Sequence, residues 1–202
     1  MSRKRIVAAA ALVALLLATA GCDKLFGPPK SPFHGVDVTG MDAGSSLRLP
    51  DFNGQVRTLA DFRGKVVAVE FGYTQCPDVC PTTLHDFAEA MKKLGTDASQ
   101  VQLLFVTVDP NRDTPELLRE YVPAFDPRFL GLRGDAAAID RVTKDFHVYA
   151  QARPGKTAET YTVDHASQVF IFDRTGKLRL MIPAGTAPAD IASDLRVLLD
   201  NS

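Results

Sequence analysis

Short apolar runs alternate with amphipathic stretches along most of this chain, a pattern that favours an α/β domain. Residues 66–71 and 101–108 are mostly apolar, as expected for strands buried on both faces. Between them, residues 83–94 place apolar side chains at helical spacing. This order predicts a strand–helix–strand unit with two parallel strands and a right-handed connection.

Weaker patterns on either side of this unit predict the rest of the fold. Residues 47–49 and 56–59 alternate around Asn53-Gly54, which favours a β-hairpin. A second hairpin is expected from residues 168–172 and 177–182. The other expected elements are helices at residues 116–125, 136–146 and 189–199 and a short strand at 148–150. The chain is therefore predicted to form an α/β sandwich with a central mixed sheet, flanking helices and an N-terminal hairpin.

The first residues predict export. Three basic residues precede an apolar run at 6–18 that is too short and too rich in alanine for a membrane span, so residues 1–21 are interpreted as a signal peptide. The run ends in LATAGC at 17–22, which resembles a bacterial lipobox and predicts lipidation of Cys22, although Thr19 stands where an aliphatic residue is usual. Asp23 would favour the inner membrane under the enteric sorting rule. We expect a lipid-anchored protein at the periplasmic face of that membrane.

Composition sets the domain boundaries. Residues 22–45 are rich in proline, glycine and serine and are predicted to be a flexible tether, so that residues 46–202 form one domain. The formal net charge is −1 for the whole chain and −4 once residues 1–21 are removed. A weakly acidic chain has no electrostatic footprint for DNA or RNA, and we expect no nucleic-acid partner.

The chemistry centres on Cys76 and Cys80, which follow a predicted strand and precede a predicted helix. Two thiols at this spacing can hold a soft metal ion or cycle as a disulfide. A structural disulfide is disfavoured, because so small a loop removes little chain entropy. Each cysteine precedes a proline, which predicts one tight loop from Cys76 to Cys80 with Pro81 in the first helical turn. Exposed amides there would lower thiol pKa values, which suits both roles.

A histidine is the usual third donor for a copper site that also holds Cu(II). Three of the four histidines, His34, His85 and His147, have settings that fit ordinary structural positions. His165 lies in a polar stretch at 162–167, interpreted as a turn that leads into a buried strand and could face the cysteine loop. Taken alone, it is better explained as a residue of a surface loop.

The chain resembles the Sco (SenC/PrrC-like) proteins, a family of thioredoxin-fold copper chaperones. Three separated motifs carry the resemblance: FGYTQCPDVCP at 71–81, VDPNRDTP at 108–115 and VDH at 163–165. The likeness covers about residues 45–200, and it implies a thioredoxin-like sandwich.

The resemblance further implies that Cys76, Cys80 and His165 bind one copper ion, as Cu(I) or Cu(II), and that the protein is a metallochaperone rather than an enzyme. It implies delivery to the copper-centre subunit of cytochrome c oxidase, where copper enters the binuclear centre, and we expect an upstream partner that is a copper donor or a thiol reductant. Asp164 could orient His165 or contact a partner, or serve only as a turn residue. Asp113 is explained as an acidic cap of the helix that follows it.

The main alternative is a thiol–disulfide oxidoreductase of the same fold that uses Cys76 and Cys80 to keep extracytoplasmic or copper-site cysteines reduced. The spacing is Cys-x₃-Cys rather than the Cys-x₂-Cys of thioredoxin, and no proline lies in 164–168 where thioredoxin places its cis-proline. A purely redox protein also has no need of His165. Both roles remain open, since one dithiol could perform both.

Overall fold

A mixed sheet of six strands organises the domain, in the order β1-β10-β9-β4-β5-β6. The computed structural model describes residues 31–155 and 160–200. Strands β4, β5 and β6 run parallel, whereas β9, β10 and β1 are joined to them by antiparallel pairs. The strands span Val36–Asp37 (β1), Val66–Gly72 (β4), Val101–Thr107 (β5), Leu130–Leu132 (β6), Val169–Phe172 (β9) and Leu178–Ile182 (β10).

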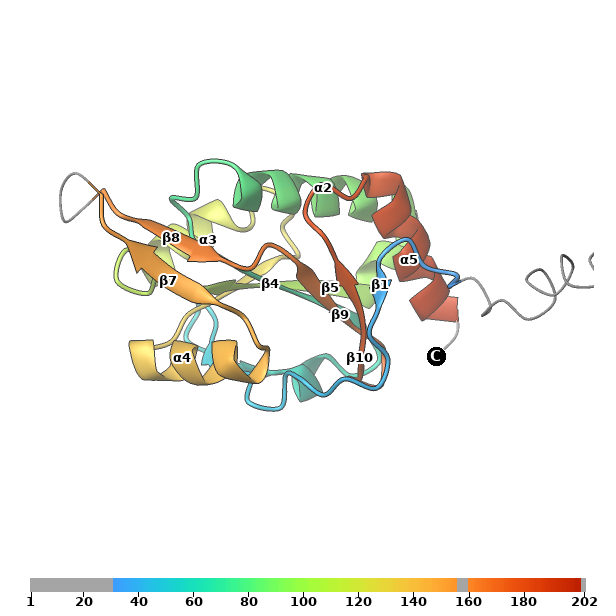
Figure 1. The fold of residues 1–202 in the computed structure, drawn as a ribbon. Coiled ribbons are helices and arrows are strands. Elements are labelled where there is room, and N and C mark those ends of the chain that lie inside the picture. The colour runs from blue at the N-terminus through green and yellow to red at the C-terminus, as the bar shows by residue number, and fades with distance from the viewer. Residues whose placement is uncertain (1–30, 156–159, 201–202) are drawn as a thin grey trace, which may run out of the picture. The chain divides into compact units, whose positions relative to one another are not determined.

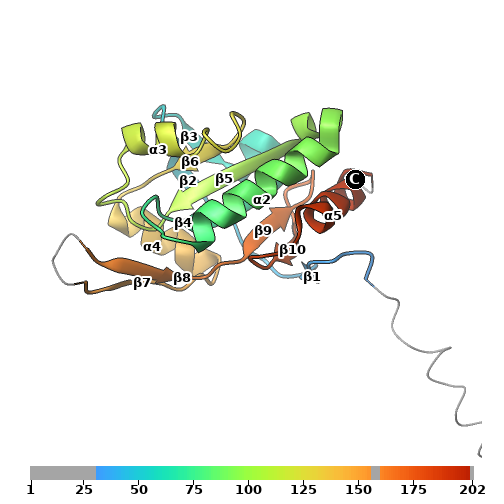
Figure 2. The same cartoon turned by 90° about the horizontal axis from the view of Figure 1, so that it is seen from above.

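Helices cover both faces of this sheet (Figure 1). They span Val79–Leu94 (α2), Pro115–Tyr121 (α3), Ala136–Asp145 (α4) and Pro188–Asp200 (α5), with 3-10 turns at Leu59–Phe62 (η2) and Gly95–Gln100 (η3). Helices α2 and α5 lie side by side on one face, as Figure 2 shows from above, and α4 lies on the other. The predicted mixed sheet with flanking helices is confirmed, and the arrangement is the expected thioredoxin-like sandwich.

The two faces of β4 account for the two hydrophobic cores. All seven of its residues are buried. Because successive side chains of a strand point to opposite faces, Val66 and Ala68 pack with α2 and α5, while Val67, Val69 and Phe71 pack with α4. The predicted N-terminal hairpin, Arg48–Pro50 (β2) and Val56–Thr58 (β3), forms its own two-stranded sheet. Its residue Leu49 completes the core on the α4 side.

A second two-stranded sheet projects beyond the end of the main one (Figures 1 and 2). Its strands are Ala150–Arg153 (β7) and Thr162–His165 (β8), paired so that Ala150 lies opposite His165. The strand predicted at 148–150 instead lies at Ala150–Arg153. The turn predicted at 162–167 was wrong for its first four residues, which form strand β8. Strand β7 is exposed along its whole length, and its apolar positions are only alanines, so the alternation that marks this hairpin in the sequence is weak.

The start of the domain lies earlier than predicted. Val36 and Asp37 form strand β1 and pair with β10 at the edge of the main sheet. The amides of His34 and Gly35 both donate to the buried carboxylate of Asp194, each at 2.8 Å. A flexible tether that extends to residue 45 is thus wrong for these positions, because they are fixed to the sheet and to α5.

The proposed signal peptide and the lipidation of Cys22 lie outside the described residues. Within the described part of the chain, none of the helices has the length and apolar character needed to cross a membrane.

Candidate metal centre

The two cysteines lie where β4 gives way to α2. Cys76 lies in the connecting loop, and its amide donates to the carbonyl of Tyr73 at 3.1 Å. The predicted loop from Cys76 to Cys80 was too long, because α2 begins at Val79 and places Cys80 in the first helical turn. Pro81 lies in that turn, as predicted. Proline is tolerated there because the first amides of a helix have no partner within it.

The Cys80 thiol is fully buried against the end of β4. Gly72 makes this possible, because a Cβ atom at that position would lie 2.7 Å from Cys80 Sγ and 2.7 Å from the Phe105 ring. Such distances are too short for a carbon atom beside sulfur or carbon, so only glycine allows the helix to bring its sulfur this close to the strand.

His165 ends strand β8 and faces the cysteines. Its Nε2 atom lies 3.4 Å from Cys80 Sγ, and its Nδ1 atom lies 2.8 Å from the carbonyl of Ala166. Since a carbonyl only accepts hydrogen bonds, Nδ1 carries the hydrogen in this contact, and the lone pair of Nε2 is left facing the sulfurs. The ring also stands edge-on to Tyr73, with centroids 5.8 Å apart. Both contacts hold the imidazole in one orientation.

Cys76, Cys80 and His165 thus form one cluster, in which the ligand atoms lie within 4.8 Å of one another. A cavity of about 220 Å³ opens beside it, lined in part by Cys76, Pro77 and His165. The other histidines lie elsewhere: His34 contacts α5, and His85 and His147 are exposed on the surface. Two thiols and one imidazole form a donor set suited to a soft metal ion.

The thiols differ in acidity. A hydrogen bond from the Cys80 thiol lowers the pKa of Cys76 to about 4; burial opposes this shift, and the amides of Cys80 and Asp78 support it. The same shared hydrogen, together with burial, raises the pKa of Cys80. Cys76 is therefore the thiolate at neutral pH, and Cys80 holds the shared hydrogen until a metal ion or an oxidant displaces it.

Asp164 does not contact the imidazole. Its carboxylate accepts from Arg153 Nε across the β7–β8 pair at 2.7 Å, and both side chains are about half exposed. The hypothesis that Asp164 orients His165 thus has no support in this geometry, since the Ala166 carbonyl holds the ring nitrogen instead.

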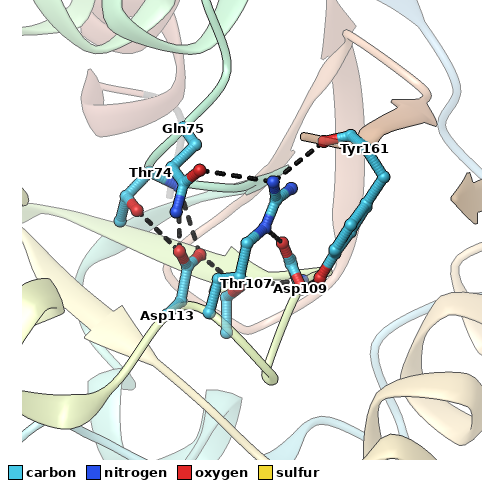
Figure 3. Close-up of polar contacts among 7 residues, drawn as sticks. Thr74, Gln75, Thr107, Asp109, Asp113 and Tyr161 are labelled. Carbon is cyan, nitrogen blue, oxygen red and sulfur yellow. Dashed lines mark hydrogen bonds and ion pairs between the residues drawn. The ribbon is translucent and has the colours of Figure 1, made fainter. Parts of the chain in front are cut away.

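The sequence interpretation missed residues around the cluster. Glu70 is a carboxylate within the buried strand β4, and its pKa is raised well above the usual range, chiefly by burial and further by Cys76. Asp113 was interpreted as a helix cap, but the cap of α3 is Thr114, whose hydroxyl accepts from Leu117. Asp113 is buried and accepts from Thr74 and Thr107 instead (Figure 3). The only sequence signal for Glu70 was its position as an acidic residue within an otherwise apolar strand.

Residues 38–200 match the SCO1/SenC family model. The chain belongs to the SCO1/SenC family. An SCO2-like protein of Rickettsia prowazekii is 35% identical over 153 residues, which cover 74% of this chain and 75% of the relative. The mitochondrial SCO2 homolog of Bos taurus is 41% identical over 130 residues, 63% of this chain and 49% of the relative.

Solved structures of the family superpose on the described fold. Copper-bound ScoI of Bradyrhizobium japonicum gives a TM-score of 0.70 at 36% identity and covers 81% of this chain and 98% of its own. Apo Sco1 of Thermus thermophilus gives 0.74 at 35% identity, with 85% and 99% covered. The thioredoxin-like sandwich is therefore shared with SCO1/SenC proteins solved with and without copper.

Proposed function

We propose that this protein is a copper chaperone that binds one copper ion through Cys76, Cys80 and His165. The observation that carries the proposal is the cluster of these three donors within 4.8 Å. Two sulfurs suit Cu(I), and the added imidazole gives a centre that also holds Cu(II). Support also comes from the copper-bound ScoI of B. japonicum, which shares 36% identity over nearly its whole length.

The recipient in this proposal is the copper-centre subunit of cytochrome c oxidase, and the cargo enters the binuclear centre of that subunit. The protein would be exported, held by a lipid on Cys22 at the periplasmic face of the inner membrane, and loaded by a copper donor after its cysteines are reduced. Mass spectrometry of Cys22 tests the anchor, because lipidation adds a defined mass that Cys22→Ser abolishes. Mixing the copper-loaded chain with the soluble domain of the subunit tests delivery. Transfer would reduce the copper absorption bands of this protein and produce those of the subunit.

The central test is an anaerobic copper titration of the reduced full-length chain, followed by absorption and electron paramagnetic resonance. We expect one equivalent of copper in either oxidation state and a thiolate-to-Cu(II) absorption band that is lost in His165→Ala. The matched control is His85→Ala, which removes an exposed histidine from α2 and should leave the band unchanged. Cu(II) binding that survives in His165→Ala with the same band would contradict the three-donor site.

A second candidate function is thiol–disulfide exchange. It is favoured by the close approach of the two thiols and by the lowered pKa of Cys76, which makes that sulfur the attacking thiolate. The two functions separate at His165, because disulfide chemistry uses only the sulfurs. Exchange with a small disulfide should continue in His165→Ala and stop in Cys76→Ala. A chain that exchanges disulfides but takes up no copper would leave this second function as the explanation of the site.

A further inference from the structure

The donors of the candidate centre belong to two different parts of the fold. The sulfurs are carried by the β4–α2 connection of the main sheet, whereas His165 is carried by β8, which pairs only with β7 among the described strands. The hairpin projects beyond the main sheet (Figure 2). Some contact must therefore fix the imidazole relative to the sulfurs, because the backbone pairing of β8 alone does not.

Arg112 bridges the two parts from the loop after β5. Its Nη1 atom donates to the side-chain oxygen of Gln75 at 3.2 Å and to the carbonyl of Tyr161 at 2.8 Å. Gln75 directly precedes Cys76, and Tyr161 directly precedes β8. One planar guanidinium thus holds both the loop at residues 73–78, here called the sulfur loop because it carries Cys76, and the base of the strand that carries His165 (Figure 3).

The aromatic rings around Arg112 extend this bridge. The guanidinium carbon lies 3.6 Å from the centroid of the Tyr161 ring and 5.5 Å from that of Tyr73. Tyr73 in turn stands edge-on to His165, with centroids 5.8 Å apart. The side chain of Tyr73 therefore lies between Arg112 and the His165 imidazole and contacts both.

Asp109 fixes the bridge itself. Its carboxylate accepts from Arg112 Nε through one oxygen and from the Tyr161 hydroxyl, at 2.6 Å, through the other. The Arg112 side chain is only 14% exposed, so this ion pair is shielded from solvent and its geometry is restricted on several sides. Neighbouring Asp113 holds the same sulfur loop by accepting from the amide and hydroxyl of Thr74.

We propose that Arg112 is a positioning residue that sets the place of the His165 imidazole relative to the two sulfurs. The inference rests on the proposed copper function and deepens it: Arg112 touches no donor atom, and it decides whether the third donor is in reach. The centre loses its nitrogen ligand when the bridge is cut but keeps both sulfurs. Because Cu(I) is satisfied by the thiolates and Cu(II) needs the imidazole, the loss falls on Cu(II).

The test uses the full-length chain with Arg112→Ala and Arg112→Lys. Removing a group that orients a metal ligand costs about 10- to 100-fold in metal affinity, and we expect a loss of this size for Cu(II) in Arg112→Ala, with Cu(I) affinity changed by less than about threefold. The Cu(II) affinity of Arg112→Lys should fall nearly as far, because a lysine ammonium group does not reproduce the planar arrangement of donors in a guanidinium. The control is Arg128→Ala, which removes another guanidinium that is paired with an aspartate, Asp126, and whose side-chain hydrogen bonds go to that residue rather than to the donors' elements.

A readout without copper separates this inference from the proposed function. In the metal-free protein, nuclear Overhauser effects between the Tyr73 and His165 rings should be present in the natural sequence and in Arg128→Ala, and lost in Arg112→Ala. A natural chain that fails to bind copper would overturn the proposed function, while the ring contacts would still decide the positioning role.

Intact ring contacts or undiminished Cu(II) affinity in Arg112→Ala would each overturn the proposal. Should that variant fail to fold, Gln75→Ala cuts the same bridge at an exposed side chain and leaves the ion pair with Asp109 in place. It should weaken the ring contacts and lower Cu(II) affinity severalfold relative to Arg128→Ala, and unchanged values would overturn the proposal.

Discussion

The Sγ atom of Cys80 and the Nε2 atom of His165 lie 3.4 Å apart, although 85 residues separate them in the chain. The sulfur is brought there by the first turn of α2 and the imidazole by the last residue of β8. Neither local element explains the contact, because it arises only when the hairpin lies against the end of the main sheet.

The first prediction concerns the pH dependence of Cys76. A pKa near 4 means that the Cys76 thiol is almost fully ionised above roughly pH 6. The thiolate is lost as the pH falls through the pKa, near pH 4. Alkylation at Cys76 should then change little between pH 6 and 8, whereas an ordinary thiol with a pKa of about 8.5 would react roughly 80-fold faster at the upper end. Peptide-resolved mass spectrometry of the reduced, metal-free chain distinguishes Cys76 from Cys22. A tenfold rise at Cys76 over this range would contradict the prediction.

The second prediction separates the cause of that shift by a pair of variants. The hydrogen bond from Cys80 is the largest contribution to the low pKa of Cys76. Cys80→Ala removes the donor, so the pH at which the Cys76 thiolate forms should move upward. Cys80→Ser keeps a hydroxyl donor at the same place and should hold that pH low. Thiolate absorbance against pH measures both, and equal behaviour of the two variants would show that the hydrogen bond is not the cause.

The third prediction concerns Gly72. An alanine there would place its Cβ 2.7 Å from Cys80 Sγ, so the thiol must move or the strand must yield. We expect a loss of about 1–3 kcal/mol in the free energy of unfolding, together with weaker copper binding. Gly64→Ala is the control, since residue 64 has φ +85° and open space around it, so its strain costs about 1 kcal/mol without touching the site. Unfolding curves and copper titrations should separate the two variants, and equal copper affinity would refute the crowding argument.

The fourth prediction concerns Asp194, which anchors the start of the domain. Each oxygen of its buried carboxylate accepts a hydrogen bond from one amide. An Asn side chain keeps one of these oxygens and replaces the other with an NH₂ group, which cannot accept. Asp194→Asn should therefore lower the free energy of unfolding by about 1.5–3 kcal/mol. Asp190→Asn removes only a part-exposed contact with His34 and should cost at most about 1 kcal/mol. Similar denaturation midpoints for the two variants would show that residues 34–35 add little stability.

The sequence predicted the central elements because their signals are local. Apolar runs indicated β4 and β5, helical spacing indicated most of α2, and the short interval between Cys76 and Cys80 placed both thiols at one end of a strand. The two-residue strand β1 and the three-residue strand β6 escaped prediction, because such short strands exist only through pairing with neighbours distant in the chain.

The errors at the site have the same origin. The proline after Cys80 disfavours a helical conformation for that residue, but its burial against Gly72 overrides that local preference. Asp113 satisfied the local pattern of a helix cap, yet its partners are Thr74 and Thr107, on the sulfur loop and strand β5. The position of His165 before a buried strand suggested that it could face the cysteine loop, but only the family resemblance favoured it as a ligand, because strand β8 has too few buried residues to be recognised.

Under the proposed copper function, the attachment of the donors implies the order in which they release the metal ion. The two sulfurs belong to the β4–α2 connection at the end of the central sheet, whereas the imidazole stands on the separate two-stranded sheet β7–β8, which contacts the rest of the domain through Arg112 and the buried side chain of Val163. Under that function, an incoming ligand would displace the imidazole nitrogen more readily than either sulfur, because the hairpin that carries His165 pairs with no strand of the main sheet. The β7–β8 hairpin would then be the part of the site that opens first, while the two sulfurs stay in place at the end of β4.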